Sequence, residues 1–292
     1  MSSFPMLAPL YALASAFLFA LSNHFTNLGL EDSDARTGTI ISIASSALIY
    51  WIAAPFFLVS WYWTTQACLL FALVGVIRPA LSSMLAAQSI KIMGPTLSSA
   101  LTAVTPLFGA FFAIVLLGEH MNLPLAAGTA LVVAGAIVAA WSPTGIKRSW
   151  PLWALALPLG ASLIRATGHT VTKIGLVEVS SASFAVLVAN SVSMVSCLAA
   201  FQTQRRPLAG TRRSALWFIA SGVSVALSLQ FLNNALQVGD MVSVIPIVSA
   251  TPLFTLLMGM LWFGREIITT RTVITIALII PGVILVALAG RL

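Results

Sequence analysis

Ten long apolar stretches, separated by short polar breaks, dominate this sequence and limit what the chain can fold into. A helix that crosses about 30 Å of hydrocarbon needs about 20 apolar residues, and each stretch is close to that length. The runs are continuous and not alternating, so they favour helices over strands. We therefore predict an all-α integral membrane protein with ten transmembrane helices. The predicted spans are 5–29, 38–60, 65–90, 95–117, 122–141, 151–175, 180–201, 214–236, 241–262 and 271–289.

The composition agrees with this fold class. Of the 292 residues, 59% are hydrophobic and only 7% are charged, whereas soluble domains are about 25% charged. A soluble enzyme and a disordered chain are both excluded on this ground. The two cysteines, Cys68 and Cys197, lie inside apolar runs, where packed thiols are favoured over a disulfide or a metal site. The first stretch is too long and too polar at its end for a removed signal peptide, so it is predicted to be a true span.

Basic residues gather in the connections that follow every second predicted span. Because the net charge of +7 comes from short loops, it indicates membrane topology and not nucleic-acid binding. The positive-inside rule places these connections in the cytoplasm and both termini outside, in a membrane that we expect to be a bacterial inner membrane. The opposite side carries only Arg291 and Lys173. The cytoplasmic set is Arg36, Lys91, Lys147, Arg148, Arg205, Arg206, Arg212, Arg213, Arg265 and Arg271.

The two halves of the chain resemble each other. The segment TPLFGAFFAIVLLGE at Thr105–Glu119 matches TPLFTLLMGMLWFGRE at Thr251–Glu266. PLYALA at Pro9–Ala14 likewise matches PLWALA at Pro151–Ala156. Chance matching of common apolar letters could explain one such pair, but matches in the same order at offsets of 142 to 147 residues indicate a duplication.

Each predicted repeat, 1–146 and 147–292, holds five spans. Since five is odd, the second repeat enters the membrane from the opposite side to the first. The sequence thus predicts two inverted five-helix repeats around a central cavity, an architecture typical of alternating-access carriers, which bind their substrate near the membrane midplane.

The sequence resembles the drug/metabolite transporter superfamily of EamA type. The resemblance lies in ten helices arranged as two sets of five, and in a TPLF motif followed by Gly-Glu at the end of the fourth span of each half. The resemblance covers essentially the whole chain. Within the superfamily, the sequence most resembles YddG-like amino-acid exporters. It implies a basket of helices around a cavity lined by the first, third and fourth helices of each half. It also implies export of metabolites, often amino acids. The second motif departs from the pattern, with Gly264-Arg265-Glu266 in place of Gly118-Glu119.

Two arginines lie near the middle of predicted spans, where ionisable side chains usually face a cavity or a partner. Arg78 is in the third span and Arg165 in the sixth. Their planar guanidinium groups fit a carboxylate, so they are predicted to anchor an anionic or zwitterionic substrate. A structural role is the alternative. Arg78 precedes Pro79, whose kink frees backbone carbonyls that an arginine could satisfy, and either side chain could extend to the interface.

Other polar residues in the spans predict the rest of the cavity lining. Gln230, Asn233 and Asn234 form a stripe with Gln237 at helical spacing, and Gln88 matches one of its positions at an offset of 146. Single buried amides and hydroxyls more often join helices, but four amides on one stripe favour a cavity. The predicted substrate-binding residues are Asn23, His24, Asn27, Arg78, Ser82, Gln88, Ser98, Thr102, Arg165, His169, Gln230, Asn233, Asn234 and Ser249.

Pro106 and Pro252 occupy matching positions in the fourth and ninth spans, and each would remove one helix hydrogen bond. They are candidate hinges, with a plain structural kink as the alternative. All seven carboxylates fall at the ends of predicted spans or in loops. If protons are coupled to transport, the candidates are therefore His24 and His169, and facilitated export is the default expectation.

These features predict a secondary transporter that exports small zwitterionic metabolites, with amino acids as the first choice. No phosphate loop, metal-ligand spacing or nucleophile motif occurs in the sequence, so no cofactor, metal or catalytic residue is predicted. The expected partners are the lipid bilayer and a small-molecule substrate, and no small-residue face singles out a dimer, which leaves a monomer as the simplest state. The alternatives are an exporter of bulkier or drug-like metabolites, a passive channel, and a membrane-embedded enzyme.

Overall fold

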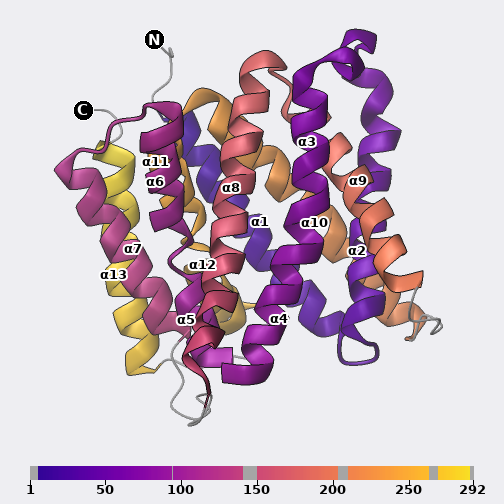
Figure 1. Ribbon diagram of the computed structural model, residues 1–292. Helices are drawn as coiled ribbons and strands as arrows, with labels where there is room; N and C mark the ends of the chain where they lie inside the picture. The colour runs from indigo at the N-terminus through magenta and orange to yellow at the C-terminus, as the bar shows by residue number, and fades with distance from the viewer. Residues whose placement is uncertain (1–5, 94, 141–149, 203–209, 263–268, 290–292) are drawn as a thin grey trace.

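The computed structural model describes residues 6–93, 95–140, 150–202, 210–262 and 269–289, and all regular elements in these ranges are helical. The helices pack side by side, and the start of the first helix and the end of the last one lie at the same end of the molecule (Figure 1). The α-helices are α1 (Leu7–Gly29), α2 (Ala35–Ala53), α3 (Gln66–Val76), α4 (Ser82–Met93), α5 (Pro95–Thr102), α6 (Thr105–Leu117), α7 (Leu123–Ala140), α8 (Ala156–Glu178), α9 (Ala182–Gln202), α10 (Arg212–Val238), α11 (Met241–Val248), α12 (Thr251–Leu261) and α13 (Thr270–Ala289).

Within the described ranges, eight helical stretches are long and apolar enough to cross a membrane. They correspond to α1, α2, α5 with α6, α7, α9, α10, α11 with α12, and α13. The third predicted span is also helical but is divided into α3, a π-helical turn at Ile77–Leu81 (η3) and α4. The sixth is the 23-residue α8, which carries Arg165, His169 and Lys173. The all-α membrane architecture is confirmed, and the count of ten spans stays a prediction.

Two of the predicted spans are broken at matching places. α5 ends at Thr102 and α6 begins at Thr105, while α11 ends at Val248 and α12 begins at Thr251. Pro106 and Pro252 stand in the first turns of α6 and α12. A proline is well tolerated there, because the first turn of a helix has no partner for its N–H groups. The prolines therefore begin new helices after a break, and their role as hinges stays a prediction.

Contacts of two glycines show that both halves pack alike. A Cβ atom on Gly29 would lie 2.5 Å from the ring of Phe218, and one on Gly175 would lie 2.5 Å from the ring of Phe71. Gly175 follows Gly29 by 146 residues, and Phe218 follows Phe71 by 147. The same glycine–aromatic contact thus occurs once per half, at the offset seen in the sequence motifs.

A second pair of glycines repeats the observation between other helices. A Cβ atom on Gly75 in α3 would lie 2.5 Å from the backbone oxygen of Ala189 in α9. One on Gly222 in α10 would meet the backbone oxygen of Ser42 in α2. Gly222 follows Gly75 by 147 residues, and Ala189 follows Ser42 by the same number. Along these four helices, an offset of 147 therefore relates equivalent positions.

Serine pairs join α1 to α10. The hydroxyl oxygens of Ser15 and Ser228 are 3.1 Å apart, and those of Ser22 and Ser221 are 2.9 Å apart. All four residues are buried. Such small side chains let the two backbones approach closely, and the shared hydrogen bonds satisfy polar atoms that would otherwise face hydrocarbon.

A buried ion pair ties together three helices at one end of the molecule. Lys173 of α8 contacts Glu119 at 2.5 Å, just after α6. The carboxylate of Glu119 also accepts hydrogen bonds from the backbone N–H groups of Met241 and Val242, in the first turn of α11. A carboxylate at a helix N-terminus is stabilised by the unpaired N–H groups and the helix dipole. Glu266, which ends the matching sequence motif, lies outside the described residues.

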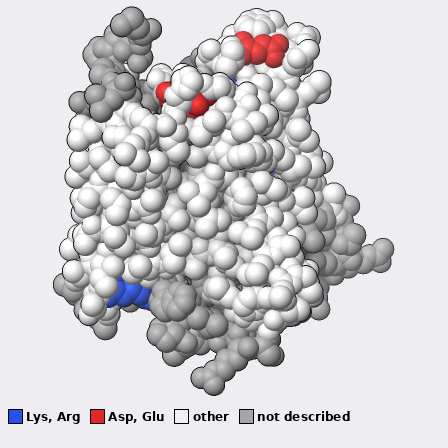
Figure 2. All heavy atoms as spheres, turned by 60° about the vertical axis from the view of Figure 1, so that its left-hand side comes forward, with Lys and Arg blue, Asp and Glu red and all other residues white. Residues whose placement is uncertain are grey.

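On one face of the molecule, the visible charged side chains lie mainly toward the two ends. Figure 2 shows acidic residues at its upper end and basic residues toward its lower end, separated by a broad uncharged belt. This distribution is what a protein embedded in a bilayer requires. Several residues of the predicted topology lie outside the described ranges, and the orientation stays a prediction. They are Lys147, Arg148, Arg205, Arg206, Arg265 and Arg291.

Candidate functional site

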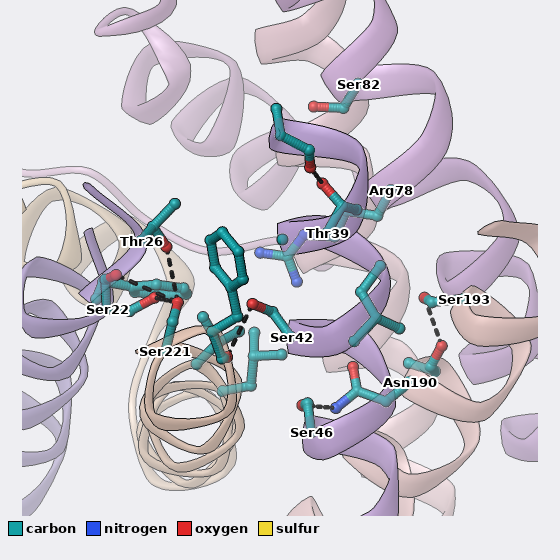
Figure 3. A pocket seen from close by; sticks show the side chains of 18 of the residues that line it. Ser22, Thr26, Thr39, Ser42, Ser46, Arg78, Ser82, Asn190, Ser193 and Ser221 are labelled. Carbon is teal, nitrogen blue, oxygen red and sulfur yellow. Dashed lines mark hydrogen bonds between the residues drawn. The ribbon is translucent and has the colours of Figure 1, made fainter. Parts of the chain in front are cut away.

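A cavity of about 460 Å³ lies among α1, α2, α3, α8, α9 and α10, and we call it the arginine cavity. Its lining contains the two cations Arg78 and Arg165 and the amide Asn190, and none of its described lining residues is acidic. Its volume is in the range of small-molecule sites. Figure 3 shows several of the polar side chains around it. The hydroxyl residues of the lining are Ser22, Thr26, Thr39, Ser42, Ser46, Ser82, Ser193 and Ser221.

A second cavity, of about 560 Å³, is lined by both helix breaks, and we call it the helix-break cavity. Thr102 and Pro106 line it from the α5–α6 break, and Ser249 and Pro252 from the α11–α12 break. Its charged lining residues, among those described, are Arg165 and Arg271. The two breaks, which lie far apart in the sequence, therefore border one space.

Phe19 of α1 and Arg165 of α8 line both cavities. The two residues are 146 positions apart, the offset that also relates Gly29 to Gly175 in the same two helices. They therefore occupy equivalent positions in the two halves, and they separate one cavity from the other.

Arg78 projects from the π-helical turn η3, where Pro79 lacks the N–H group needed to continue a regular helix. Its terminal nitrogen lies 3.4 Å from Nε2 of His169. Among the described residues, its guanidinium has no other hydrogen-bond partner, and no carboxylate lies within 4 Å. Gly168 leaves room for it, since a Cβ atom there would lie 3.2 Å from Cδ of Arg78. Most of its N–H donors are thus available to the cavity.

Within the part of the chain that the structure describes, Arg165 makes one hydrogen bond, at the boundary of the two cavities. Its Nε donates to the hydroxyl of Ser82 over 3.1 Å, which leaves the terminal nitrogens free for a ligand. One turn earlier on α8, the hydroxyl of Ser162 donates to the backbone oxygen of Thr102 over 3.2 Å. α8 is therefore attached to the end of α5 close to the helix break.

Sequence reasoning missed the contribution of α2 and α9. Nδ2 of Asn190 donates to the hydroxyl of Ser46 over 2.6 Å, and both residues line the arginine cavity. Thr39 and Ser42 lie on the same face of α2 as Ser46, at helical spacing. The sequence contains this polar stripe, but the family resemblance implied a lining made of the first, third and fourth helices of each half.

Six of the predicted substrate-binding residues line one of the cavities. Arg78 and Ser82 line the arginine cavity, Asn23, Thr102 and Ser249 line the helix-break cavity, and Arg165 lines both. A role in binding for the rest stays a prediction, since they do not line these two spaces. They are His24, Asn27, Gln88, Ser98, His169, Gln230, Asn233 and Asn234.

The amide stripe of α10 makes contacts between helices. The side-chain oxygen of Gln230 accepts hydrogen bonds from the hydroxyls of Tyr50, at 2.9 Å, and Ser183, at 3.2 Å. Its nitrogen lies 3.4 Å from Oδ1 of Asn234. Gln88 is exposed, and it lies one position beyond the equivalent of Asn234, because the offset along this helix is 147 and not 146.

The two candidate histidines for proton coupling are both buried and bonded. Nε2 of His24 lies 2.9 Å from the backbone oxygen of Thr255 in α12. Nε2 of His169 faces Arg78, as described above. Because a permanently charged guanidinium can only donate, His169 accepts this bond through an unprotonated nitrogen. Coupling by either histidine stays a prediction.

Comparison with known proteins adds the family. The model of the EamA-like transporter family matches residues 6–141 and 152–288, so the second match begins 146 residues after the first. A solved structure described as "Crystal structure of protein" has the same fold, with a TM-score of 0.79. It shares 16% sequence identity, over 100% of this chain and 99% of that one. No curated protein matched the sequence. The chain belongs to the EamA-like transporter family and is a membrane transporter of the drug/metabolite type.

Proposed function

We propose that this transporter exports small zwitterionic metabolites, with amino acids as the first choice, by alternating access. The observation that carries the proposal is the position of Arg165, which lines both cavities while Arg78 lines one of them. A substrate carboxylate held by Arg165 can be reached from either space. We further propose that the substrate-binding residues predicted from the sequence act on this path.

The electrostatics favour a substrate that carries a carboxylate. Arg78 and Arg165 interact electrostatically with each other, and no described acidic residue lines either cavity. Two buried cations without a counter-ion are costly in a membrane protein, and a bound carboxylate would compensate them. Charge-assisted, bidentate hydrogen bonds are the strongest polar contacts that such groups make. A cationic substrate would instead be repelled.

Alternating access follows from the proposed topology of ten spans in two inverted repeats, 1–146 and 147–292. The start of α1 and the end of α13 lie at the same end of the molecule, in agreement with an even number of crossings (Figure 1). Both helix breaks border one cavity, and carriers of this type use discontinuous helices around their substrate. We propose that Pro106 and Pro252 mark the hinges at which the half-helices move.

The proposed setting is a bacterial inner membrane, with both termini in the periplasm and a single chain as the transporting unit. The basic connections predicted to face the cytoplasm support this orientation. A gradient of the substrate itself would drive export, because the described carboxylates lie at helix ends and none is placed to carry a proton across the midplane.

The test is counterflow into proteoliposomes preloaded in turn with neutral, aromatic, basic and acidic amino acids. We expect saturable exchange for neutral or aromatic amino acids, and none for basic ones. Exchange that does not saturate would indicate a channel, and chemical alteration of the solute would indicate an enzyme. If no amino acid exchanges with correctly folded protein, the amino-acid proposal is wrong, and larger or drug-like metabolites form the next panel. A pH jump on the exchanging system then tests proton coupling.

A further inference from the structure

Equivalent residues of the two halves line the arginine cavity together, and they differ in chemistry. Arg165 is equivalent to Phe19 at an offset of 146, and Arg78 is equivalent to Val225 at an offset of 147. All four residues line the cavity. The duplication therefore supplies matching positions, and in each of these pairs one position carries a charge while the other is apolar.

A third pair follows the same rule. Asn190 in α9 is equivalent to Ile43 in α2 at an offset of 147, and both line the cavity. The cavity therefore carries two guanidinium groups and one amide at positions whose equivalents in the other half are apolar and also line it. A ligand that fits it has a compact polar head and an uncharged remainder.

Asn190 is positioned to accept a hydrogen bond from that polar head. Its side chain is largely buried, and its Nδ2 donates to Ser46, which is 3% exposed. This bond leaves Oδ1 as the free end of the amide, and no described residue donates to it. Figure 3 shows Asn190 and Arg78 around the same space, on α9 and η3 respectively.

Nearby hydroxyl groups are less suited to donate to a ligand. The hydroxyl of Ser42 donates to the backbone oxygen of Phe218 over 3.0 Å, and that of Ser193 to the backbone oxygen of Ala189 over 2.7 Å. A hydroxyl has only one proton, so these side chains offer lone pairs to the cavity and not donors. Together with Oδ1 of Asn190, these two hydroxyls supply neutral acceptors to the cavity.

We propose that Asn190 binds the ammonium group of the substrate whose carboxylate is held by Arg78 and Arg165. This assignment rests on the proposed transport of zwitterionic metabolites. An ammonium group has three donors and no acceptor, so it complements an amide oxygen and hydroxyl lone pairs. The opposite order is excluded, because the guanidinium groups would repel an ammonium group. Asn190 therefore separates α-amino acids from carboxylic acids that lack the amino group.

The test compares binding of L-leucine with binding of 2-hydroxy-4-methylpentanoate, in which a hydroxyl replaces the ammonium group. Titration calorimetry on the purified full-length protein at neutral pH measures both affinities. We expect the wild-type protein to prefer leucine by about tenfold or more, the ratio typical of one hydrogen bond to a charged group. Asn190→Ile, which copies the equivalent Ile43, should lower leucine affinity about tenfold and leave the hydroxy acid unchanged.

Two further variants control the result. Ser191→Ala changes the next residue on α9, which contacts Trp51 and does not line the cavity, and should keep the wild-type preference. Asn190→Asp replaces the amide by a carboxylate of the same size and should increase the preference for leucine. This variant decides the matter if Asn190→Ile does not fold.

The outcomes separate this inference from the proposed function. If the wild-type protein binds leucine but Asn190→Ile keeps the full preference, or loses affinity for both ligands equally, Asn190 is not the ammonium site. An Asn190→Asp variant with no increased preference leads to the same conclusion. If the wild-type protein neither binds leucine nor exchanges any amino acid, the proposed substrate class is wrong and the inference falls with it.

Discussion

The third helix of the first half and its counterpart in the second half have diverged in shape. α10 runs for 27 residues without interruption, whereas the matching segment is divided by η3 at Ile77–Leu81. Pro79 explains the difference, because it cannot donate a backbone hydrogen bond and α10 has an alanine, Ala226, at the equivalent position. At the neighbouring position, the equivalent residues Arg78 and Val225 both line the cavity. The duplication thus accounts for where the helices pack, and later divergence accounts for which side chains line the cavity.

Neither half carries the whole site. The first half contributes Arg78, and the second contributes Arg165 and Asn190. The apolar partners of these residues also come from both halves. The proposed binding site therefore forms only when both repeats are assembled. Substitutions that replace a residue of one half by its equivalent from the other half test this directly.

The largest effect is expected for Arg78→Val, which copies its counterpart Val225. Loss of a bidentate contact to the substrate carboxylate should lower kcat/KM for counterflow by about 100-fold or more, because each charge-assisted hydrogen bond contributes about 1.5–3 kcal/mol. Thermal stability should be retained or raised, since a buried unpaired charge is removed. Transport within twofold of wild type would rule out Arg78 as the anchor.

Arg165→Gln should reduce transport by about tenfold, because glutamine can still bond to Ser82 but cannot hold a carboxylate with two donors. Counterflow measures the loss, and fluorescence-detected chromatography checks that the protein is still inserted and folded. Arg165→Lys keeps the charge and should give an intermediate rate. Equal rates for glutamine and lysine would show that charge at this position is not used.

Lys173→Asn copies the equivalent residue Asn27 and breaks the ion pair with Glu119. Lys173 is 16% and Glu119 7% exposed, so the loss should lower stability by about 2 kcal/mol. A thermal-unfolding scan in detergent measures the shift. Asn27→Ala, on the equivalent helix, is the matched control and should change little. Similar melting temperatures for both variants would contradict a structural role for the ion pair.

Gly29→Ala and Gly175→Ala test whether the two halves are packed equivalently. In both variants the new methyl group would meet a phenylalanine ring at 2.5 Å, so each should lose about 1–2 kcal/mol of stability. If the two halves are packed equivalently, the two variants should lose similar amounts of stability. A large loss in one variant alone would show that the halves adapt differently at this contact.

The smallest effect on stability is expected for Pro106→Ala and Pro252→Ala, below about 1 kcal/mol each, since both prolines stand in a first helical turn. If the helix breaks move during transport, the turnover rate should change in both variants while substrate affinity stays the same. Single-turnover measurements separate the two quantities. Unchanged turnover in both variants would remove the prolines from the mechanism.

The fold class and the charged part of the site could be predicted from the sequence. Apolar runs of membrane length are a local property, and the repeated TPLF motif establishes the duplication without any structure. Arg78 and Arg165 stood out because ionisable residues in a span are rare and costly. These predictions needed only composition and spacing, and the cavity lining includes both arginines.

The tertiary structure alone decided which polar side chains meet. The contact between Asn190 and Ser46 joins positions 144 apart in sequence, whereas Gln230 is bonded to Tyr50 and lines neither of the two cavities. In a membrane protein the lipid-facing and buried sides of a helix are both apolar, so periodicity does not reveal which face is buried. Helix–helix packing settles that question, and it determines which amide lines a cavity, as Asn190 does, and which one only joins helices, as Gln230 does.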